Sequence, residues 1–286
     1  MKNRSSLLGL SLLALIVLAA VLGPILSPHG VGELSTQRLT APSTQNWMGT
    51  DLHGRDLLTR LLYGARISLL VGLVGASISL VVGVAYGLVA GYFGGRLDNA
   101  MMRLVDILYA LPRIVLVIVL ISLFDLKLKH ALDGTFLSSM ATHARLLLLF
   151  VGLGLVEWLT LARIVRAQVL SIKERPFVLS SRLIGQRTPT ILFRQILPQI
   201  LPIIVTYLTL ALPAVILEES FLSFLGLGVQ APLASWGTLL ADGASLLNPI
   251  ATPWWLIVFP ALSLTTTLLL LNLLGDQLKL DEDSRE

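Results

Sequence analysis

The organisation of this chain is decided by one stretch, Lys173–Pro198, which reads KERPFVLSSRLIGQRTPTILFRQILP. The stretch is basic, and it lies between two long apolar runs, Leu146–Leu170 and Ile200–Phe224. Each run is long enough to cross a bilayer, because about 20 apolar residues rising ~1.5 Å each span the hydrocarbon core. The stretch is therefore predicted to be a loop between two membrane-spanning helices.

Local signals predict two short helices within this loop. Pro176 suits the first turn of a helix, and Gly185 is a natural terminator. Thr188-Pro189 supplies a cap and a first-turn residue for a second helix that leads into Leu197-Pro198. The apolar residues predicted to share one face of the first helix are Val178, Leu179, Leu183 and Ile184. A short amphipathic helix in this position can either lie on the bilayer or dock onto a partner protein.

The composition places the whole chain in a membrane. Of its 286 residues, 55% are hydrophobic and 13% are charged, and the mean hydropathy is +0.83. Soluble domains carry about 25% charged residues. The absence of cysteine excludes disulfides, thiolate metal sites and a cysteine nucleophile. No long linker rich in Pro, Gly or Ser is visible, so one integral-membrane domain is the simplest interpretation.

The predicted fold is all-α, with six transmembrane helices and both termini cytoplasmic. Lys and Arg are more frequent in the segments assigned to the inside than in those assigned to the outside, which sets this orientation. No Ala-x-Ala site follows the first apolar run, so it is interpreted as a retained helix rather than a cleaved signal peptide. The predicted spans are Leu7–Leu26, Ile67–Phe93, Met101–Phe124, Leu146–Leu170, Ile200–Phe224 and Trp254–Leu274.

Three regions follow from these spans. Residues 1–66 hold the first helix and a polar outer segment, in which Leu57–Leu62 is predicted to form a helix lying in the membrane interface. Arg55, Asp56 and Arg60 are expected on the opposite face of that helix. Residues 67–276 form the core with the other five spans and the loop at 173–198, and residues 277–286 form a charged inner tail.

A stripe of small residues marks the second span as a close-packing surface. In lipid, helices associate through packing rather than through hydrophobic exclusion, so such a stripe lets a neighbouring helix approach closely. General glycine enrichment in membrane helices is the alternative, but the strict spacing of four residues favours packing. The stripe consists of Gly75, Ser79, Gly83, Gly87 and Gly91.

The motifs of enzymes and of ion-coupled or nucleotide-binding proteins are absent from the sequence. It contains no His-Glu-x-x-His, no Gly-x-Ser-x-Gly and no clustered carboxylate pair, and its four His residues lie far apart. It also lacks the Gly-x4-Gly-Lys-Ser/Thr loop that cradles nucleotide phosphates. The chain is therefore not expected to be an enzyme, to hydrolyse ATP or to bind a metal, a cofactor or nucleic acid.

Four collinear blocks resemble a known family. EWLTLARIVRAQVLSIKERPFVLSSRLIGQ (Glu157–Gln186) resembles the permease subunits of bacterial ABC importers for dipeptides, oligopeptides and nickel. The family carries a Glu-Ala-Ala loop here, followed by a glycine and a Leu-Pro pair, and these positions fall at Leu179-Ser180-Ser181, Gly185 and Leu197-Pro198. The other blocks that resemble this family are Gly49–Gly72, Gly91–Pro112 and Ser223–Gly243.

The resemblance implies a type I ABC importer permease in the bacterial cytoplasmic membrane. Two permeases, usually different, would form the pore, with this chain resembling the subunit paired with a longer one. Two cytoplasmic ATPases would use ATP and Mg, and a periplasmic or lipid-anchored binding protein would deliver the substrate. Peptides are the default substrate; nickel chelates, antimicrobial peptides and small glycosides stay open.

The resemblance also assigns the loop at 173–198 as the helix that docks on an ATPase. This sequence departs from the family at Leu179, where an acidic residue is expected. Docking is therefore predicted to rest on apolar and backbone contacts, with small side chains at Ser180 and Ser181 permitting close approach. The predicted coupling residues are Pro176, Phe177, Leu179, Ser180, Ser181, Arg182, Leu183 and Gly185.

The same residues are compatible with other interpretations of the chain. Arg175, Arg182 and Arg187 could instead bind anionic membrane lipid. A self-sufficient secondary transporter would need an ion site near the membrane midplane, often in inverted repeats, and no such repeat is visible. A membrane scaffold would not need the ordered coupling block.

Charges within the predicted spans supply candidates for the translocation path, namely Asp106, Arg113 and Glu218. Asp106 and Arg113 are expected two turns apart on one helical face, roughly 10 Å along the axis. Arg113 either meets an anionic group of the substrate or forms a structural ion pair, and the second is favoured. Glu218 and Glu219 are expected to have structural roles, and Glu157 is given none.

Overall fold

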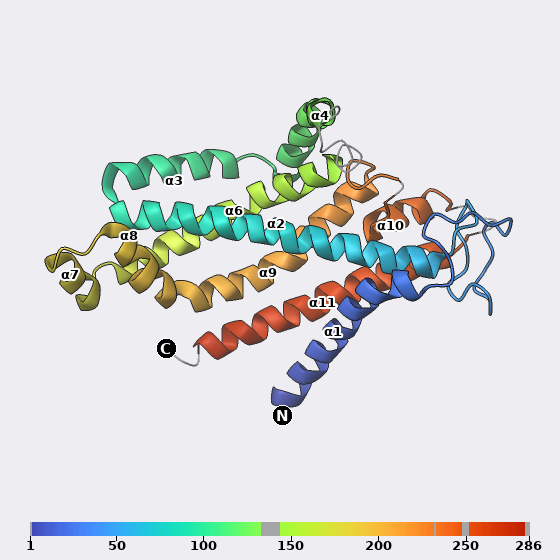
Figure 1. The fold of residues 1–286 in the computed structure, drawn as a ribbon, viewed down its shortest axis with the longest axis horizontal. Coiled ribbons are helices and arrows are strands. Elements are labelled where there is room, and N and C mark those ends of the chain that lie inside the picture. The colour runs from blue at the N-terminus through green and yellow to red at the C-terminus, as the bar shows by residue number, and fades with distance from the viewer. Residues whose placement is uncertain (1, 133–143, 232, 248–251, 284–286) are drawn as a thin grey trace.

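The computed structural model describes residues 2–132, 144–231, 233–247 and 252–283. Within these ranges every regular element is a helix (Figure 1). The elements are α1 (Lys2–Leu26), α2 (Leu57–Phe93), α3 (Gly95–Tyr109), α4 (Arg113–Leu132), α6 (Ala144–Ile172), α7 (Pro176–Leu183), α8 (Thr188–Ile191), the π-helical turn η1 (Leu192–Ile196), α9 (Leu197–Phe224), α10 (Trp236–Ala244) and α11 (Trp255–Asp283).

The predicted third span is not one continuous helix. Five of the described helical segments are long and apolar enough to cross a membrane, and α3 with α4 makes a sixth candidate that is bent by 87°. The break falls at residues 110–112, where Pro112 disfavours helical geometry at Leu111. The prediction that Asp106 and Arg113 lie on one helical face is therefore wrong, because they belong to two helices of different direction.

The predicted interfacial helix is also not a separate element. Leu57–Leu62 forms the first turns of α2, which continues unbroken to Phe93. Asp56 caps this helix by accepting a hydrogen bond from the Thr59 backbone N–H at 2.8 Å. Arg60, expected on the polar outer face, is buried instead, because it pairs with Asp51 and Asp242.

The α2–α6 pair is the most extensive helix interface in the described part of the chain. The five small residues of the predicted stripe are all buried on α2. A Cβ added at Gly83 would lie 2.9 Å from Leu161 Cβ, and one at Gly87 would lie 2.7 Å from the Ala162 carbonyl oxygen. Such distances leave no room for a side chain, so α6 approaches α2 backbone-to-backbone along this seam.

The two ends of the helical assembly differ in character (Figure 1). Residues 27–56 and α10 gather at one end of α2, and α7, α8 and the start of α3 gather at the opposite end. The loop at 173–198 is thus separated from the polar outer segment by the length of α2. This arrangement agrees with the sequence-based assignment of the two segments to opposite membrane sides, and the orientation of the termini stays a prediction.

Ion pairs stabilise the end of the assembly formed by residues 27–56 and α10, which we call the polar end. The Asp51 carboxylate accepts hydrogen bonds from Arg55 Nε at 2.7 Å and from Arg60 Nη1 at 2.6 Å. Burial alone would raise the pKa of Asp51, but the Arg55 backbone N–H and the charges of Arg60 and Arg55 outweigh burial and lower it below its ordinary value. Arg60 also reaches Asp242 of α10 at 3.1 Å, so this network ties α10 to the start of α2.

Candidate functional site

The loop at 173–198 contains the predicted short helix α7, and the predicted second helix, α8, continues through η1 into α9. Pro176 begins α7 after Arg175, whose backbone is extended, and Gly185 follows the helix with φ +75°, a conformation that glycine adopts without strain. The second helix begins at Thr188 with Pro189 in its first turn. Thr188 is not the cap that was expected, since Arg187 occupies that position and makes no side-chain capping bond.

Large apolar residues of α7 and of its C-cap are exposed. Leu183 is 87% exposed and Leu179 is 44% exposed, although both are large hydrophobic residues. We define the α7 surface as the four exposed apolar residues Phe177, Leu179, Leu183 and Ile184. Val178, predicted on the same face, is fully buried against the chain's own helices.

The buried side of α7 packs against the rest of the chain and is hydrogen-bonded to it. Ser181 is buried, donates to the Phe177 carbonyl oxygen at 2.9 Å and accepts from Gln195 Nε2 at 2.6 Å. The expectation that Ser181 leaves room for a partner is therefore wrong, because its side chain faces inward. Ser180 is exposed, with its hydroxyl bonded to the Pro176 carbonyl oxygen at 2.8 Å.

Basic side chains hold α7 against the end of α2. Arg182 stacks over the ring of Tyr92, with its Cζ 4.7 Å from the ring centroid. Lys173 donates from Nζ to the Gly91 carbonyl oxygen at 2.9 Å. These contacts join α7 to the last residues of the small-residue seam, so the position of α7 is coupled mechanically to α2.

Three ion pairs attach the broken span to α6. Asp98 of α3 binds Arg166 at 2.5 and 2.6 Å, and Asp106 binds Arg163 at 2.6 Å. Beyond the break, Arg113 Nη1 of α4 donates to Glu157 Oε1 at 2.9 Å. The pairs follow one another along α6 in antiparallel order, so Asp106 and Arg113 each find a partner on α6. Charges inside apolar spans require partners, and this rule could have identified Glu157, Arg163 and Arg166 from the sequence.

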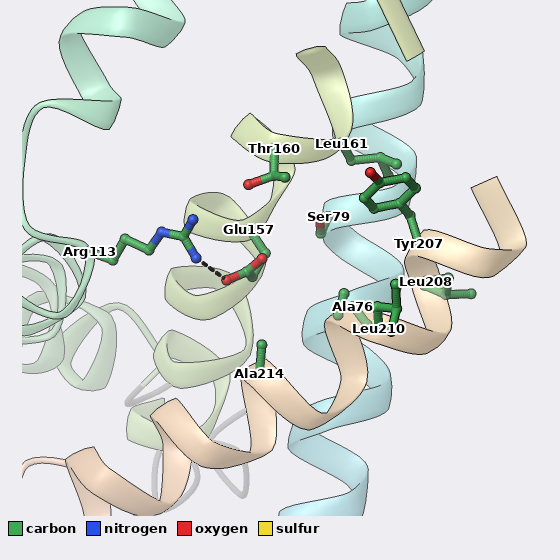
Figure 2. A pocket seen from close by; sticks show the side chains of 11 residues that line it. Ala76, Ser79, Arg113, Glu157, Thr160, Leu161, Tyr207, Leu208, Leu210 and Ala214 are labelled. Carbon is green, nitrogen blue, oxygen red and sulfur yellow. Dashed lines mark hydrogen bonds and ion pairs between the residues drawn. The ribbon is translucent and has the colours of Figure 1, made fainter. Parts of the chain in front are cut away.

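The Arg113–Glu157 pair lines a cavity of about 200 Å³ between α2, α4, α6 and α9 (Figure 2). The Glu157 side chain is 8% exposed and that of Arg113 is 38% exposed, so the pair lies at the boundary between the protein interior and open space. We call this site the charged cavity. Its other lining residues are Ala76, Ser79, Thr160, Leu161, Tyr207, Leu208, Leu210, Ala211 and Ala214.

Two adjacent glutamates of α9 have contrasting surroundings. Glu219 is fully buried and accepts hydrogen bonds from the hydroxyls of Ser223 at 2.7 Å and Ser68 at 2.9 Å, so it ties α9 to α2. Glu218 interacts electrostatically with Glu157 and Arg113. Its Oε2 atom is buried and has no hydrogen-bond partner among the described residues.

No group of three His, Asp or Glu side chains that could hold a metal ion occurs in the described ranges. The α7 surface offers apolar contact outside the helical core, and the charged cavity offers the Glu157 carboxylate and the Arg113 guanidinium within it.

Comparison with protein families gives two matches. The family described as "Binding-protein-dependent transport system inner membrane component" matches residues 83–279, which is more than half of the chain. The family described as "N-terminal TM domain of oligopeptide transport permease C" matches residues 1–48.

Curated relatives match nearly the whole chain. The dipeptide transport system permease protein DppC of Bacillus subtilis is 43% identical over 279 residues, covering 97% of this chain and 81% of the relative. The oligopeptide transport system permease protein OppC of Escherichia coli K12 is 42% identical over 282 residues, covering 98% of this chain and 86% of the relative.

A solved structure shares the fold. A chain in the inward-facing MetNI methionine ABC transporter superposes with a TM-score of 0.58 at 18% identity, covering 76% of this chain and 93% of that chain. At this identity the likeness concerns the fold alone, and it confirms the predicted architecture of an ABC importer permease.

Proposed function

Given that this chain belongs to the family of binding-protein-dependent transport system inner membrane components, and so is a multi-pass, pore-forming permease subunit of an ABC importer, we propose that it carries small peptides inward across the bacterial cytoplasmic membrane. The observation that carries the choice of substrate is the identity above 40% to dipeptide and oligopeptide permeases over nearly the full chain. The family consists of transport permeases, not enzymes.

The α7 surface is the proposed docking point of an ATPase subunit. Its apolar residues are exposed at the end of α2 opposite the polar segment, and burying them in a groove would be favourable at roughly 25 cal/mol per Å² of apolar area. The same four residues could contact lipid, but the fastening of α7 through Ser181, Arg182 and Lys173 favours a mechanical role. Docking then rests on apolar contact around Phe177, Leu179, Leu183 and Gly185, without the family's acidic residue.

The translocation path is proposed to pass the charged cavity. Of the three candidates from the sequence, Arg113 lines the cavity and Glu218 lies within electrostatic reach of it. Asp106 of α3 is paired with Arg163 of α6, so its proposed role is to hold the broken span rather than to meet the substrate. The five small residues of α2 are proposed to keep α2 and α6 together as one body during transport.

The proposed assembly contains a second, different permease, two ATPases that use ATP and Mg, and a periplasmic or lipid-anchored binding protein. Residues 1–66 are proposed as the first helix with a periplasmic segment, residues 67–276 as the permease core and residues 277–286 as a cytoplasmic tail, although α2 continues across the first of these bounds. The proposal is supported by the family membership and by the separation of the two ends of α2.

Reconstitution tests the function. The chain is assembled with its partner permease and ATPases in proteoliposomes, and uptake of radiolabelled trialanine is measured with the binding protein present. We expect uptake that requires ATP and the binding protein and that survives collapse of the proton gradient. Uptake by the permeases without ATPases, driven by an ion gradient, would instead favour a secondary transporter. ATP-dependent uptake of a nickel chelate but not of trialanine would show that the substrate is a metal chelate rather than a peptide.

A further inference from the structure

Three ionisable side chains of α4, α6 and α9 interact electrostatically beside the charged cavity. Arg113 is the cation, and its two acidic neighbours are Glu157, hydrogen-bonded at 2.9 Å, and Glu218, which interacts with it electrostatically. Arg113 also donates from Nη2 to Tyr109 Oη at 2.8 Å. The nearby Asp106–Arg163 pair is neutral by itself. When all groups are ionised, this cluster carries one positive and two negative charges, so its net charge is negative.

The surplus charge belongs to Glu218. Ala214 of α9 lines the charged cavity, and Glu218 follows it by one helical turn on the same face. Oε2 of Glu218 is buried without a hydrogen-bond partner in the described ranges, whereas Glu219 beside it accepts from three serine hydroxyls. Burying an unpaired carboxylate is costly, so this position gains free energy from a cationic hydrogen-bond donor.

Arg113 is poorly suited to receive an anionic group of the cargo. Its guanidinium already has two partners, and a carboxylate arriving there would also face Glu157 and Glu218. Like charges at close range disfavour one another. In its fully ionised state the cluster therefore favours a positive group.

We propose that Glu218, together with Glu157, receives the ammonium group of a substrate peptide during its passage, while Arg113 positions the Glu157 carboxylate. This inference rests on the proposed function of peptide import. The cavity of about 200 Å³ is smaller than the ~300–1,000 Å³ of pockets that bury drug-sized ligands. It holds one end of a peptide, which suits a site that recognises a terminal group and tolerates varied side chains.

Direct binding tests the site without the binding protein, whose own preference for peptide termini would otherwise intervene. The permease–ATPase complex is placed in nanodiscs, and binding of radiolabelled trialanine and of N-acetyl-trialanine is measured at equilibrium. We expect wild type to bind trialanine at least about tenfold more tightly, as loss of a charge-assisted hydrogen bond predicts. In Glu218→Gln the two affinities should agree within about twofold.

Matched variants keep this test decisive. Glu33→Gln removes a carboxylate from the exposed outer segment and should keep the wild-type ratio of affinities. Glu218→Ala is measured in parallel with Glu218→Gln, so the result does not depend on one variant assembling. Equal affinities in wild type, or an unchanged ratio in both Glu218 variants, would overturn the proposal. Binding of ²²Na⁺ that disappears in Glu218→Gln would assign the site to an inorganic cation and would overturn it too.

The same preparations separate failure of this inference from failure of the proposed function. Suppose that wild type takes up trialanine with ATP and its binding protein, and that the Glu218 variants keep the wild-type ratio of trialanine to N-acetyl-trialanine affinities. That result contradicts only the ammonium site. Absence of any peptide uptake by wild type contradicts the proposed function itself.

Discussion

The α7 surface and the charged cavity invert the usual distribution of residues in a folded protein. At the α7 surface, large apolar side chains are exposed outside the helical core, with Leu183 87% exposed. At the charged cavity, a carboxylate and a guanidinium lie between membrane-spanning helices. Either arrangement costs free energy in the isolated chain, and both costs fall when a second molecule is present.

The difference between them indicates what each second molecule is. An apolar exposed helix is suited to a persistent protein partner, because apolar burial is strong and not directional. A single unpaired carboxylate beside a small cavity is suited to a transient cargo, because one charge-assisted bond is specific but weak enough to release it. The α2–α6 seam connects them, since Ser79 lines the charged cavity and the Gly91 carbonyl oxygen accepts from Lys173 beside α7.

The largest effect is expected from charging the α7 surface. Leu179→Asp with Leu183→Asp should abolish retention of the ATPase in a pull-down of the complex, because a groove that fits leucine would have to desolvate two carboxylates. The control is Leu34→Asp, at a leucine 71% exposed in the outer segment, which should retain the ATPase. Undiminished retention by the double variant would show that the α7 surface contacts lipid instead.

A smaller effect is expected at the charged cavity. Arg113→Gln leaves Glu157 and Glu218 without their shared cation, and we expect ATP-driven trialanine uptake to fall by about tenfold. ATPase retention should stay at the wild-type level, because the α7 surface is intact. Unchanged uptake in Arg113→Gln would show that the charged cavity is not part of the translocation path.

The seam between the two regions can be tested through its packing. Leucine at Gly87 would force its Cβ to within 2.7 Å of the Ala162 carbonyl oxygen, so Gly87→Leu should destabilise the complex by about 1–3 kcal/mol or more. The measurement is the midpoint of thermal unfolding in detergent. Gly9→Ala is the matched control, because no atom lies within 4 Å of the added Cβ, and it should leave the midpoint unchanged.

Much of the fold could be predicted because each signal was local. The lengths of the apolar runs predicted the long helices. Pro176 and Gly185 predicted the two ends of α7, and the four-residue spacing of small residues predicted the buried face of α2. The break at residues 110–112 was missed although Pro112 was visible, since hydropathy alone joins the two segments. Helix α10 was also missed, although Ser235 and Thr238 form a capping box in front of it.

The charged cavity could be predicted only in part, because its residues come from helices distant in sequence. Arg113 and Glu218 are candidates from the sequence because they are charges within predicted spans, but Glu157 is given no role there. Pairing depends on which helices are neighbours and on the 87° bend, and neither is encoded within one span. The same applies to Val178 and Ser181, whose burial depends on the position of α8 and η1 against α7.

The smallest expected effect is at the polar end, where paired charges have only a structural role. Asp51 is held by Arg55 and Arg60, and its pKa is lowered from its ordinary value of 3.8. The native state therefore keeps Asp51 ionised at a lower pH than the unfolded chain does, so its contribution to stability is full above the unfolded-state pKa and is lost as the pH falls through the native value. Asp51→Asn should lower the unfolding midpoint at neutral pH and flatten its decline on acidification.

This last prediction sharpens the contrast with Glu218. Asp51 has partners for both carboxylate oxygens within its own chain, so its replacement should change stability and leave the ratio of trialanine to N-acetyl-trialanine binding unaltered. Glu218 lacks a partner for Oε2, so its replacement should change that ratio with little loss of stability. If both variants lowered the unfolding midpoint equally and neither changed the ratio, Glu218 would be a structural carboxylate like Asp51, and the charged cavity would have no distinct binding role.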